Sequence, residues 1–352
     1  MLDPSMLMQE AVTRKASDLH LSVHRAVTFR VRGGLAELPG GPVERADLDA
    51  LIRKIAPDRS WKEYEEVGSA DFAIQHTSGD RFRVSICKER GEPRAVLRLI
   101  PTRLLSFDEI GLPDSVKDLL MRPRGLILVT GPTGSGKTTT LATMIDWINR
   151  NQDVHLVTIE DPIEYFHKHQ KSIVTQREVG TDVPTFAEAM RRVLRQDPDV
   201  ILLGEMRDLE TISSAITAAE TGHLVFGTLH TTGAARTVDR IIDAYPTNQQ
   251  EQIRAQLSVA MVAVISQILI PRADGRGLCA AFEILITNSA VENHIRKNET
   301  FKIPSVIQTS RRAGMILLDD FLLDLVKKGT VTRETALEYA QSPRDLETRL
   351  PA

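Results

Sequence analysis

The sequence is poor in cysteine, has no excess of charge of one sign and contains no long uninterrupted apolar run. Its two cysteines, Cys87 and Cys279, are too few for a disulfide scaffold or a four-cysteine zinc site, and they fit a reducing compartment. Polar side chains interrupt the apolar residues 257–270, which are also fewer than the ~20 that a spanning helix needs. Charged residues such as Asp3 and Glu10 exclude a signal peptide. We therefore expect a cytoplasmic protein without a transmembrane segment, which reaches a membrane through a partner.

The balance of charge gives no support to nucleic-acid binding, although a local basic patch remains compatible with it. The 44 Lys and Arg residues against 47 Asp and Glu residues give a formal net charge of −3, so bulk basicity does not favour nucleic-acid binding. A hydrophobic content of 42 % and a charged content of 26 % are typical of globular proteins and exclude wholesale disorder. A chain of 352 residues predicts about two domains.

Residues 1–100 predict a small α+β domain. Apolar residues at helical spacing predict a helix near the N-terminus and a second one that begins near Ala46. Short alternating runs predict strands over 19–23, 27–31, 71–76, 81–90 and 94–100, with a hairpin turn at Gly79 and Asp80. Residues 101–115 are expected to form a linker, and a short helix is predicted over 115–121.

Residues 116–352 predict an α/β domain in which strands and helices alternate. Nearly continuous apolar strands predict a parallel sheet that helices cover on both faces. The expected strands are 124–130, 154–160, 200–205 and 223–229, and the expected helices are 137–150, 186–195 and 210–220. From about residue 248 onward we expect mostly helix.

A glycine-rich motif between a strand and a helix gives the strongest indication of function. The sequence GPTGSGKT satisfies G-x-x-x-x-G-K-[ST], whose backbone amides and helix N-terminus bind the phosphates of ATP. Lys137 is expected to reach the β- and γ-phosphates, and the Thr138 hydroxyl to bind Mg²⁺. The predicted nucleotide-binding residues are Gly131, Pro132, Thr133, Gly134, Ser135, Gly136, Lys137, Thr138 and Thr139.

Acidic residues follow two of the predicted strands. Glu205 ends one strand, where it can polarise the attacking water or support the magnesium shell. Glu160 ends the other and is followed closely by Glu164. For any one of these acids a helix cap or a solvated turn is the alternative, but acids at two strand ends favour ATP hydrolysis.

Two histidines flank the strand HLVFGTLH. His223 and His230 come without a cysteine or a third ligand, so a zinc site is not expected. A neutral histidine at a strand end can sense a phosphate, and a core or capping histidine is the equal alternative for each.

Arginines gather on the predicted strands of the first domain. Arg81 and Arg83 alternate with apolar residues and share one face of a strand, and Arg98 lies on the neighbouring strand. Composition alone favours a solvated sheet face, and the alternative is a cluster that stabilises the γ-phosphate of another subunit.

These motifs resemble those of secretion ATPases, and nearly the whole chain resembles the type IV pilus retraction ATPases in the same order. The four box motifs are GPTGSGKTTT, VTIEDPIEY, DPDVILLGEMRDLETI and TGHLVFGTLHTTGAARTVDRIIDAYP. The opening ASDLHLSV, the hairpin region RFRVSICKERGEPRAVLRLIP and the tail IQTSRRAGMILLDDFLLDLVKKGTVTRETA also match retraction ATPases. One motif departs from the family pattern, because AVENHIRK stands where these proteins usually carry AIRNLIRE.

The resemblance implies a homohexameric ring ATPase at the cytoplasmic base of a pilus, peripheral to the inner membrane. It implies a PAS-like N-terminal domain and a RecA-like core, with the inner-membrane platform protein and other pilus ATPases as partners and no nucleic acid. The residues that match the family's catalytic positions are Glu164, Glu205, His223, His230, Arg83 and Arg98.

Several alternatives remain at the level of sequence. An accessory retraction ATPase fits the altered AVENHIRK motif. Pilus assembly and type II secretion ATPases usually have a longer N-terminal region and a four-cysteine loop, neither of which is present here. A nucleic-acid motor calls for a basic pore loop or a domain of high pI, and a nucleotide-binding regulator without turnover does not account for the two strand-end acids.

Overall fold

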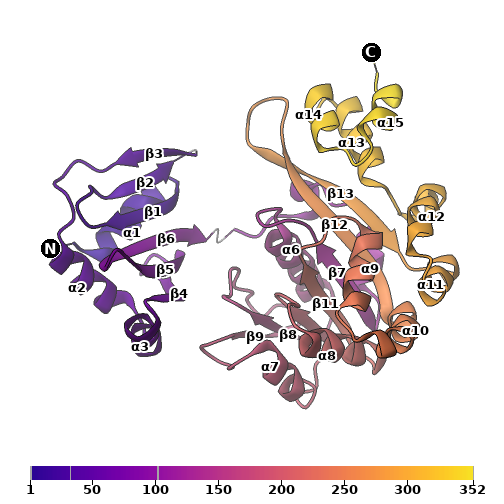
Figure 1. Ribbon diagram of the computed structural model, residues 1–352, viewed down its shortest axis with the longest axis horizontal. Coiled ribbons are helices and arrows are strands. Elements are labelled where there is room, and N and C mark those ends of the chain that lie inside the picture. The colour runs from indigo at the N-terminus through magenta and orange to yellow at the C-terminus, as the bar shows by residue number, and fades with distance from the viewer. Residues whose placement is uncertain (1, 32, 101–102, 352) are drawn as a thin grey trace. The chain divides into compact units, whose positions relative to one another are not determined.

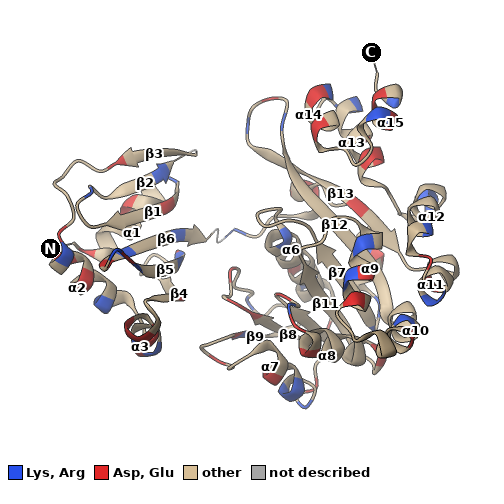
Figure 2. Cartoon of the chain, viewed as in Figure 1, with Lys and Arg blue, Asp and Glu red and all other residues tan. Residues whose placement is uncertain are grey.

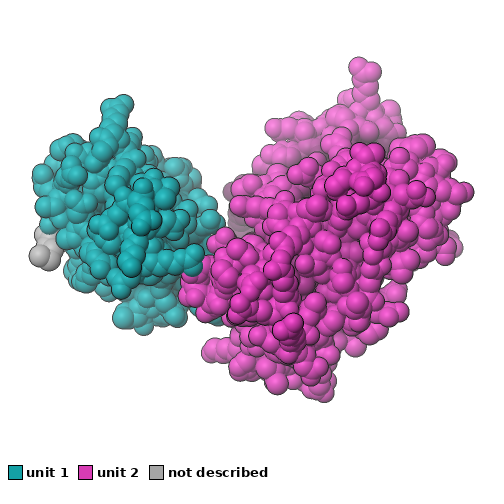
Figure 3. All heavy atoms as spheres, turned by 60° about the horizontal axis from the view of Figure 1, so that its bottom comes forward, with its two compact units in different colours: residues 1–103, 162–166 teal, residues 104–161, 167–352 magenta. Residues whose placement is uncertain are grey.

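The computed structural model describes residues 2–31, 33–100 and 103–351, which form two compact units (Figure 1). Unit 1 comprises residues 1–103 and 162–166, and unit 2 comprises residues 104–161 and 167–352 (Figure 3). Of the predicted linker 101–115, residues 101 and 102 lie outside the described part of the chain. The short helix α4 (Phe107–Ile110) lies within the same predicted linker, and its Phe107 is buried in unit 2.

Unit 1 is built on an antiparallel sheet with the strand order β3-β2-β1-β6-β5-β4. Its strands are β1 (Ala16–Ser22), β2 (Thr28–Val31), β3 (Gly34–Glu37), β4 (Ser69–Gln75), β5 (Arg81–Glu89) and β6 (Glu92–Ile100). Its helices are α1 (Pro4–Thr13), α2 (Arg45–Ile55) and α3 (Asp58–Val67). The sequence did not predict β3 or α3.

The sheet of unit 1 has one apolar and one polar face, because side chains alternate along each strand. On β5, Phe82, Val84 and Ile86 are fully buried and pack in one core with apolar residues of α1 and α2. Arg83, between two of these residues, is exposed. The predicted arginine face therefore lies on the side of the sheet opposite this core, where Arg83 is exposed but Arg81 is buried.

Unit 2 is built on a mainly parallel sheet with the strand order β13-β12-β7-β11-β10-β8-β9. Among the strands of this sheet in the described part of the chain, β13 pairs antiparallel with β12 and all other pairs are parallel. The strands are β7 (Gly125–Thr130), β8 (His155–Glu160), β9 (Ile173–Glu178), β10 (Val200–Leu203), β11 (Leu224–Leu229), β12 (Met261–Pro271) and β13 (Leu278–Ile286). Together with the antiparallel unit, this sheet confirms the predicted α/β class.

Helices cover both faces of this sheet. Along β7, Leu126 and Leu128 belong to one buried cluster, whereas Ile127 and Val129 belong to a second cluster on the opposite face. The core strands are almost free of charge, and charged residues are concentrated on helices and loops (Figure 2). The remaining helices are α5 (Ser115–Leu120), α6 (Lys137–Asn151), α7 (Phe186–Val193), α8 (Leu209–Glu220), α9 (Ala234–Asp243), α10 (Gln250–Ala260), α11 (Ser289–Arg296), α12 (Ile303–Thr309), α13 (Leu318–Lys327), α14 (Arg333–Tyr339) and α15 (Pro343–Arg349).

The expectation of mostly helix from residue 248 onward is wrong for residues 261–286. The apolar stretch 257–270 begins in α10 but continues as β12, which pairs with β7 on one side and β13 on the other. A buried strand and a buried helix give the same continuous apolar run, so periodicity did not separate them.

Candidate functional site

A glycine-rich loop, residues 131–136, joins the end of β7 to the start of α6. The backbone φ angles of Gly131, Gly134 and Gly136 are +145°, +79° and +85°, values that L side chains rarely adopt. A Cβ atom on Gly131 would lie only 2.2 Å from the backbone carbonyl oxygen of Gln267. The loop opens onto the N-terminus of a 15-residue helix, which favours binding of an anion.

The other predicted loop residues lie between these glycines or in the first turn of the helix. Pro132, Thr133 and Ser135 belong to the loop, and Thr138 and Thr139 follow Lys137 in α6. Lys137 Nζ donates to the carbonyl oxygens of Gly131, at 2.8 Å, and Pro132, at 3.0 Å. Burial lowers the pKa of Lys137, although the negative charge of Glu205 opposes this effect.

Glu205 lies just beyond the end of β10, at the same edge of the sheet as the loop. Its Oε1 accepts hydrogen bonds from Arg207 Nε at 2.6 Å and from His230 Nε2 at 2.8 Å. Burial raises the pKa of Glu205, but the bonds from Arg207 and His230 outweigh burial and hold the pKa below its usual range. Glu205 is therefore a carboxylate at neutral pH. Oε2 accepts no hydrogen bond from the rest of the described chain.

The backbone around Glu205 is fixed by the strands on both sides of β10. Gly204 N donates to the Ile159 carbonyl oxygen at 2.8 Å, and Met206 N donates to the Thr228 carbonyl oxygen at 3.1 Å. A Cβ atom on Gly204 would lie 3.2 Å from the backbone of Glu160, so the small residue lets the chain pass close to β8. These contacts fix the position of Glu205 at the carboxyl end of β10.

The two histidines do not share a site within the chain. His230 follows the carboxyl end of β11 and contacts Glu205, whereas His223 precedes the amino end of the same strand. The rise of a β-strand separates them by about 20 Å. His223 Nδ1 donates to the Ala218 carbonyl oxygen at 2.9 Å, in the manner of a capping histidine. β11 therefore carries the two residues to opposite edges of the sheet, and a catalytic role for His223 stays a prediction from the family motif.

The acids after β8 have different surroundings. Glu160 is nearly buried and accepts hydrogen bonds from Thr158 Oγ1, at 2.7 Å, and Gln176 Nε2, at 3.2 Å. Glu164 lies in the segment 162–166, which belongs to unit 1. In that segment, the Ile163 carbonyl oxygen accepts a 2.6 Å hydrogen bond from Arg81 Nη1.

Arg83 and Arg98 lie opposite each other on β5 and β6 of unit 1. Arg98 Nε donates to Asp18 Oδ1 at 2.8 Å, and Arg30 Nε lies 3.9 Å from Asp18 Oδ2. Burial raises the pKa of Asp18, but hydrogen bonds from Arg98 and Ser17 outweigh it and leave the pKa lowered. Asp18 thus orients Arg98 on the polar face of the sheet.

We expect Asp18→Asn to lower the free energy of unfolding by about 1–2 kcal/mol at pH 7, because it removes a charged hydrogen bond whose arginine partner is largely exposed. A lowered pKa stabilises the fold above the unfolded-state pKa of Asp, about 3.9, and this contribution is lost as pH falls through the folded-state value. The difference between parent and variant should therefore shrink in acid. Urea denaturation across pH measures it.

The control for this prediction is Asp71→Asn. Asp71 lies on the exposed side of β4 and forms no ion pair within the described residues. The Asp71→Asn variant should have the same free energy of unfolding as the parent. Equal stabilities for parent and Asp18→Asn at pH 7 would contradict the assigned role of Asp18.

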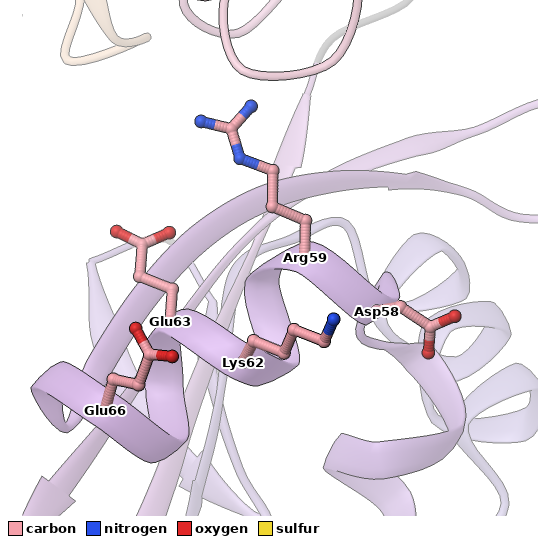
Figure 4. A pocket seen from close by; sticks show the side chains of 5 residues that line it. All are labelled: Asp58, Arg59, Lys62, Glu63 and Glu66. Atoms are coloured by element: carbon pink, nitrogen blue, oxygen red, sulfur yellow. The ribbon is translucent and has the colours of Figure 1, made fainter.

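A shallow depression on unit 1 lies outside this site. Its lining consists of charged side chains that all come from α3, and none comes from the glycine-rich loop or a strand end (Figure 4). They are Asp58, Arg59, Lys62, Glu63 and Glu66. We read this surface as a solvated helix face.

Some residues of the site carry little signal in the sequence. Arg207 belongs to none of the predicted site residues, although it lies two positions after Glu205. Ser266 and Gln267 were noticed only as interruptions of an apolar stretch, yet Ser266 Oγ accepts from Gly233 N at 2.9 Å and Gln267 Nε2 donates to the Ser135 carbonyl oxygen at 2.5 Å. A polar pair within a buried apolar run was the available signal.

The chain is similar to pilus proteins along nearly its whole length. The family described as type II/IV secretion system protein matches residues 2–345. PilT of Pseudomonas aeruginosa, named a type IV pilus retraction ATPase, is 46 % identical over 344 residues, 98 % of this chain and 100 % of PilT. A twitching motility protein of Neisseria gonorrhoeae is 46 % identical over 318 residues, 90 % of this chain and 85 % of that protein. The crystal structure of the pilus retraction motor PilT with bound ADP is 44 % identical and has a TM-score of 0.92, covering 99 % of this chain and 100 % of that one.

One further property concerns membranes. In residues 2–31, 33–100 and 103–351, no helix combines the length and the apolar character that crossing a bilayer requires.

Proposed function

The chain belongs to the type II/IV secretion system protein family and is an ATPase of the pilus retraction type, and from this premise we propose that it works as a homohexameric motor that hydrolyses Mg-ATP to retract type IV pili. The similarity to PilT confirms the predicted family and the predicted pilus retraction ATPase activity. The observation that carries the proposal is the placement of Glu205 and His230 at the same sheet edge as the glycine-rich loop and Lys137.

The nucleotide site suits ATP with magnesium. The structure of a relative is described with ADP bound. In this chain, the loop 131–136 and Lys137 provide the backbone amides and the charged side chain that would bind the phosphates. Among the described residues no cluster of three His, Cys, Asp or Glu side chains could hold a metal ion by itself. Magnesium typically keeps several waters and binds through few protein groups and the phosphates, so the Thr138 hydroxyl is sufficient as its direct ligand.

In the mechanism that we propose, residues of this chain bind the charged phosphates and orient the attacking water molecule. Bound magnesium neutralises charge on the phosphates. Lys137 leaves the loop carbonyl oxygens for the phosphates, and the backbone amides of the loop surround them. The ionised Glu205 accepts a hydrogen bond from the attacking water and orients it, while His230 and Arg207 hold the carboxylate in place.

Assembly supplies the remaining groups of the proposed site. Arg83 and Arg98 lie on the polar face of unit 1, and in the proposed ring they approach the γ-phosphate bound by the neighbouring subunit. Glu164, which also belongs to unit 1, contributes a carboxylate to the same proposed site. His223, which matches the second histidine of the family motif, lies at the other end of β11, and we assign it no separate step. The ring works in the cytoplasm at the inner membrane, with the membrane platform protein and other pilus ATPases as partners and without nucleic acid.

One observation favours an accessory retraction motor as a second candidate. The segment AVENHIRK forms α11, in which Val291 and Ile295 are buried whereas Glu292 and His294 reach the surface. Of the four positions that depart from the usual AIRNLIRE motif, Val291 is buried, whereas Glu292, His294 and Lys297 are at least partly exposed, where a partner would meet them. The fold is retained while the surface chemistry changes.

Fibre retraction in cells tests the proposal. Cells that lack their own retraction ATPase are given this chain, and retraction of individual fibres is followed by microscopy. We expect the parent chain to restore retraction. If it fails although the purified protein hydrolyses ATP, the accessory function is favoured, and strong stimulation of turnover by single-stranded DNA would instead support a nucleic-acid motor.

A further inference from the structure

The geometry points to Gln267 as a positioning residue that holds the phosphate-binding loop from the neighbouring strand β12 and so sets the affinity for nucleotide. This role rests on the proposed nucleotide site. It concerns a residue that touches the loop and not the phosphates.

Gln267 contacts the loop at both of its ends. Its side chain is 1 % exposed, and Nε2 donates to the Ser135 carbonyl oxygen at 2.5 Å. Its backbone carbonyl oxygen lies 2.2 Å from the place of a Cβ atom on Gly131. Nε2 also lies 3.2 Å from the place of a Cβ atom on Gly136. Gly131, Ser135 and Gly136 of the loop therefore all pack close to Gln267.

The chemistry of the amide explains why a polar residue lies in a buried strand. Gln267 Oε1 and Ser135 Oγ are both buried without a hydrogen-bond partner in the described chain. Burying an unsatisfied polar atom costs about 1–3 kcal/mol, which an apolar side chain of the same length would avoid. The assigned amide orientation follows from the partner, because a carbonyl oxygen accepts only from the NH₂ group. The bond to Ser135 is thus the contribution that offsets this cost.

The neighbouring residue holds a second loop of the site. Ser266 Oγ accepts from Gly233 N, and successive side chains of a strand point to opposite faces. Gly233 lies in the turn that links His230 to α9. Two consecutive residues of β12 thus fix the phosphate-binding loop and the turn after His230.

The test replaces Gln267 by methionine, which keeps the length of the side chain and removes its hydrogen bond. We expect the dissociation constant for ADP, measured by calorimetry on the full chain, to rise about tenfold or more, since the loop loses its fixed conformation. The KM for ATP should rise with it, while kcat at saturating ATP should change less. Thermal unfolding without nucleotide reports whether the variant is folded.

Gln152→Met is the matched control. Gln152 Nε2 likewise donates to a backbone carbonyl oxygen, that of Leu120, at 2.8 Å, but it lies just after the other end of α6. It should leave ADP affinity unchanged. ADP affinity within twofold of the parent for a folded Gln267→Met would overturn the inference, whereas a parent that binds no ADP would overturn the proposed function.

A second variant keeps the inference testable if Gln267→Met does not fold. In Gln267→Glu, a protonated carboxyl can donate to the Ser135 carbonyl oxygen, whereas a carboxylate repels it. We expect the ADP affinity of this variant, relative to the parent, to improve as pH falls. A constant ratio across pH would count against a role for this hydrogen bond.

Discussion

Glu205→Gln is expected to lower ATP turnover by roughly 10²-fold or more while ATP and ADP still bind. The amide keeps the size of the side chain, and its carbonyl oxygen can still accept from Arg207 and His230, which contact Oε1 in the parent. It cannot carry the negative charge that orients and activates water. The loss should therefore appear in kcat and not in affinity.

Phosphate release under saturating ATP and calorimetry with ADP measure the two quantities. Glu188→Gln is the control, because Glu188 on α7 also accepts from an arginine, Arg192 Nε at 2.8 Å, on the exposed surface of the helix. The Glu188→Gln variant should hydrolyse ATP at the parent's rate. Turnover of Glu205→Gln within tenfold of the parent would remove Glu205 from the catalytic role. In cells, the same variant should fail to restore fibre retraction.

Gly131→Ala is expected to weaken ADP binding by about 10²-fold or more, a loss of at least ~2.7 kcal/mol. The added methyl group would lie 2.2 Å from the Gln267 carbonyl oxygen and 2.7 Å from Ser135 Oγ. The first of these contacts is with backbone in a central sheet, which cannot move aside cheaply. The loop must therefore shift away from β12 and lose the shape that surrounds the phosphates.

Gly134→Ala separates this collision from backbone strain. Gly134 also has a positive φ, +79°, but a Cβ atom there would meet no atom within 4 Å. Strain alone costs about 1–2 kcal/mol, so this variant should bind ADP no more than about thirtyfold more weakly than the parent. Calorimetry measures the dissociation constant for ADP of both folded variants. If Gly131→Ala binds as well as Gly134→Ala, the close contact with β12 does not shape the site.

The sequence was informative where function depends on local pattern. The loop 131–136, the helix after it and the strand that ends before Glu205 each follow from residues adjacent in the chain. The arginine face of unit 1 followed from simple alternation along β5. Site roles for Glu164, Arg83 and Arg98 stay predictions, since they depend on contacts that a ring would create.

The sequence was least informative where distant segments meet. Gln267 and Ser135 are 132 positions apart, so their hydrogen bond has no local signature. The strands β12 and β13 were missed because the pattern of a buried strand does not differ from that of a buried helix.

The segment 162–166 has a consequence for synthesis on the ribosome. It belongs to unit 1, where the Ile163 carbonyl oxygen accepts a hydrogen bond from Arg81 Nη1, yet it is translated about sixty residues after β6. At 5–20 residues per second, the N-terminal unit waits roughly 3–12 s for this segment. A nascent chain that stops at residue 103 lacks this partner of Arg81. Completion of the first unit thus depends on synthesis of the first two core strands of the second.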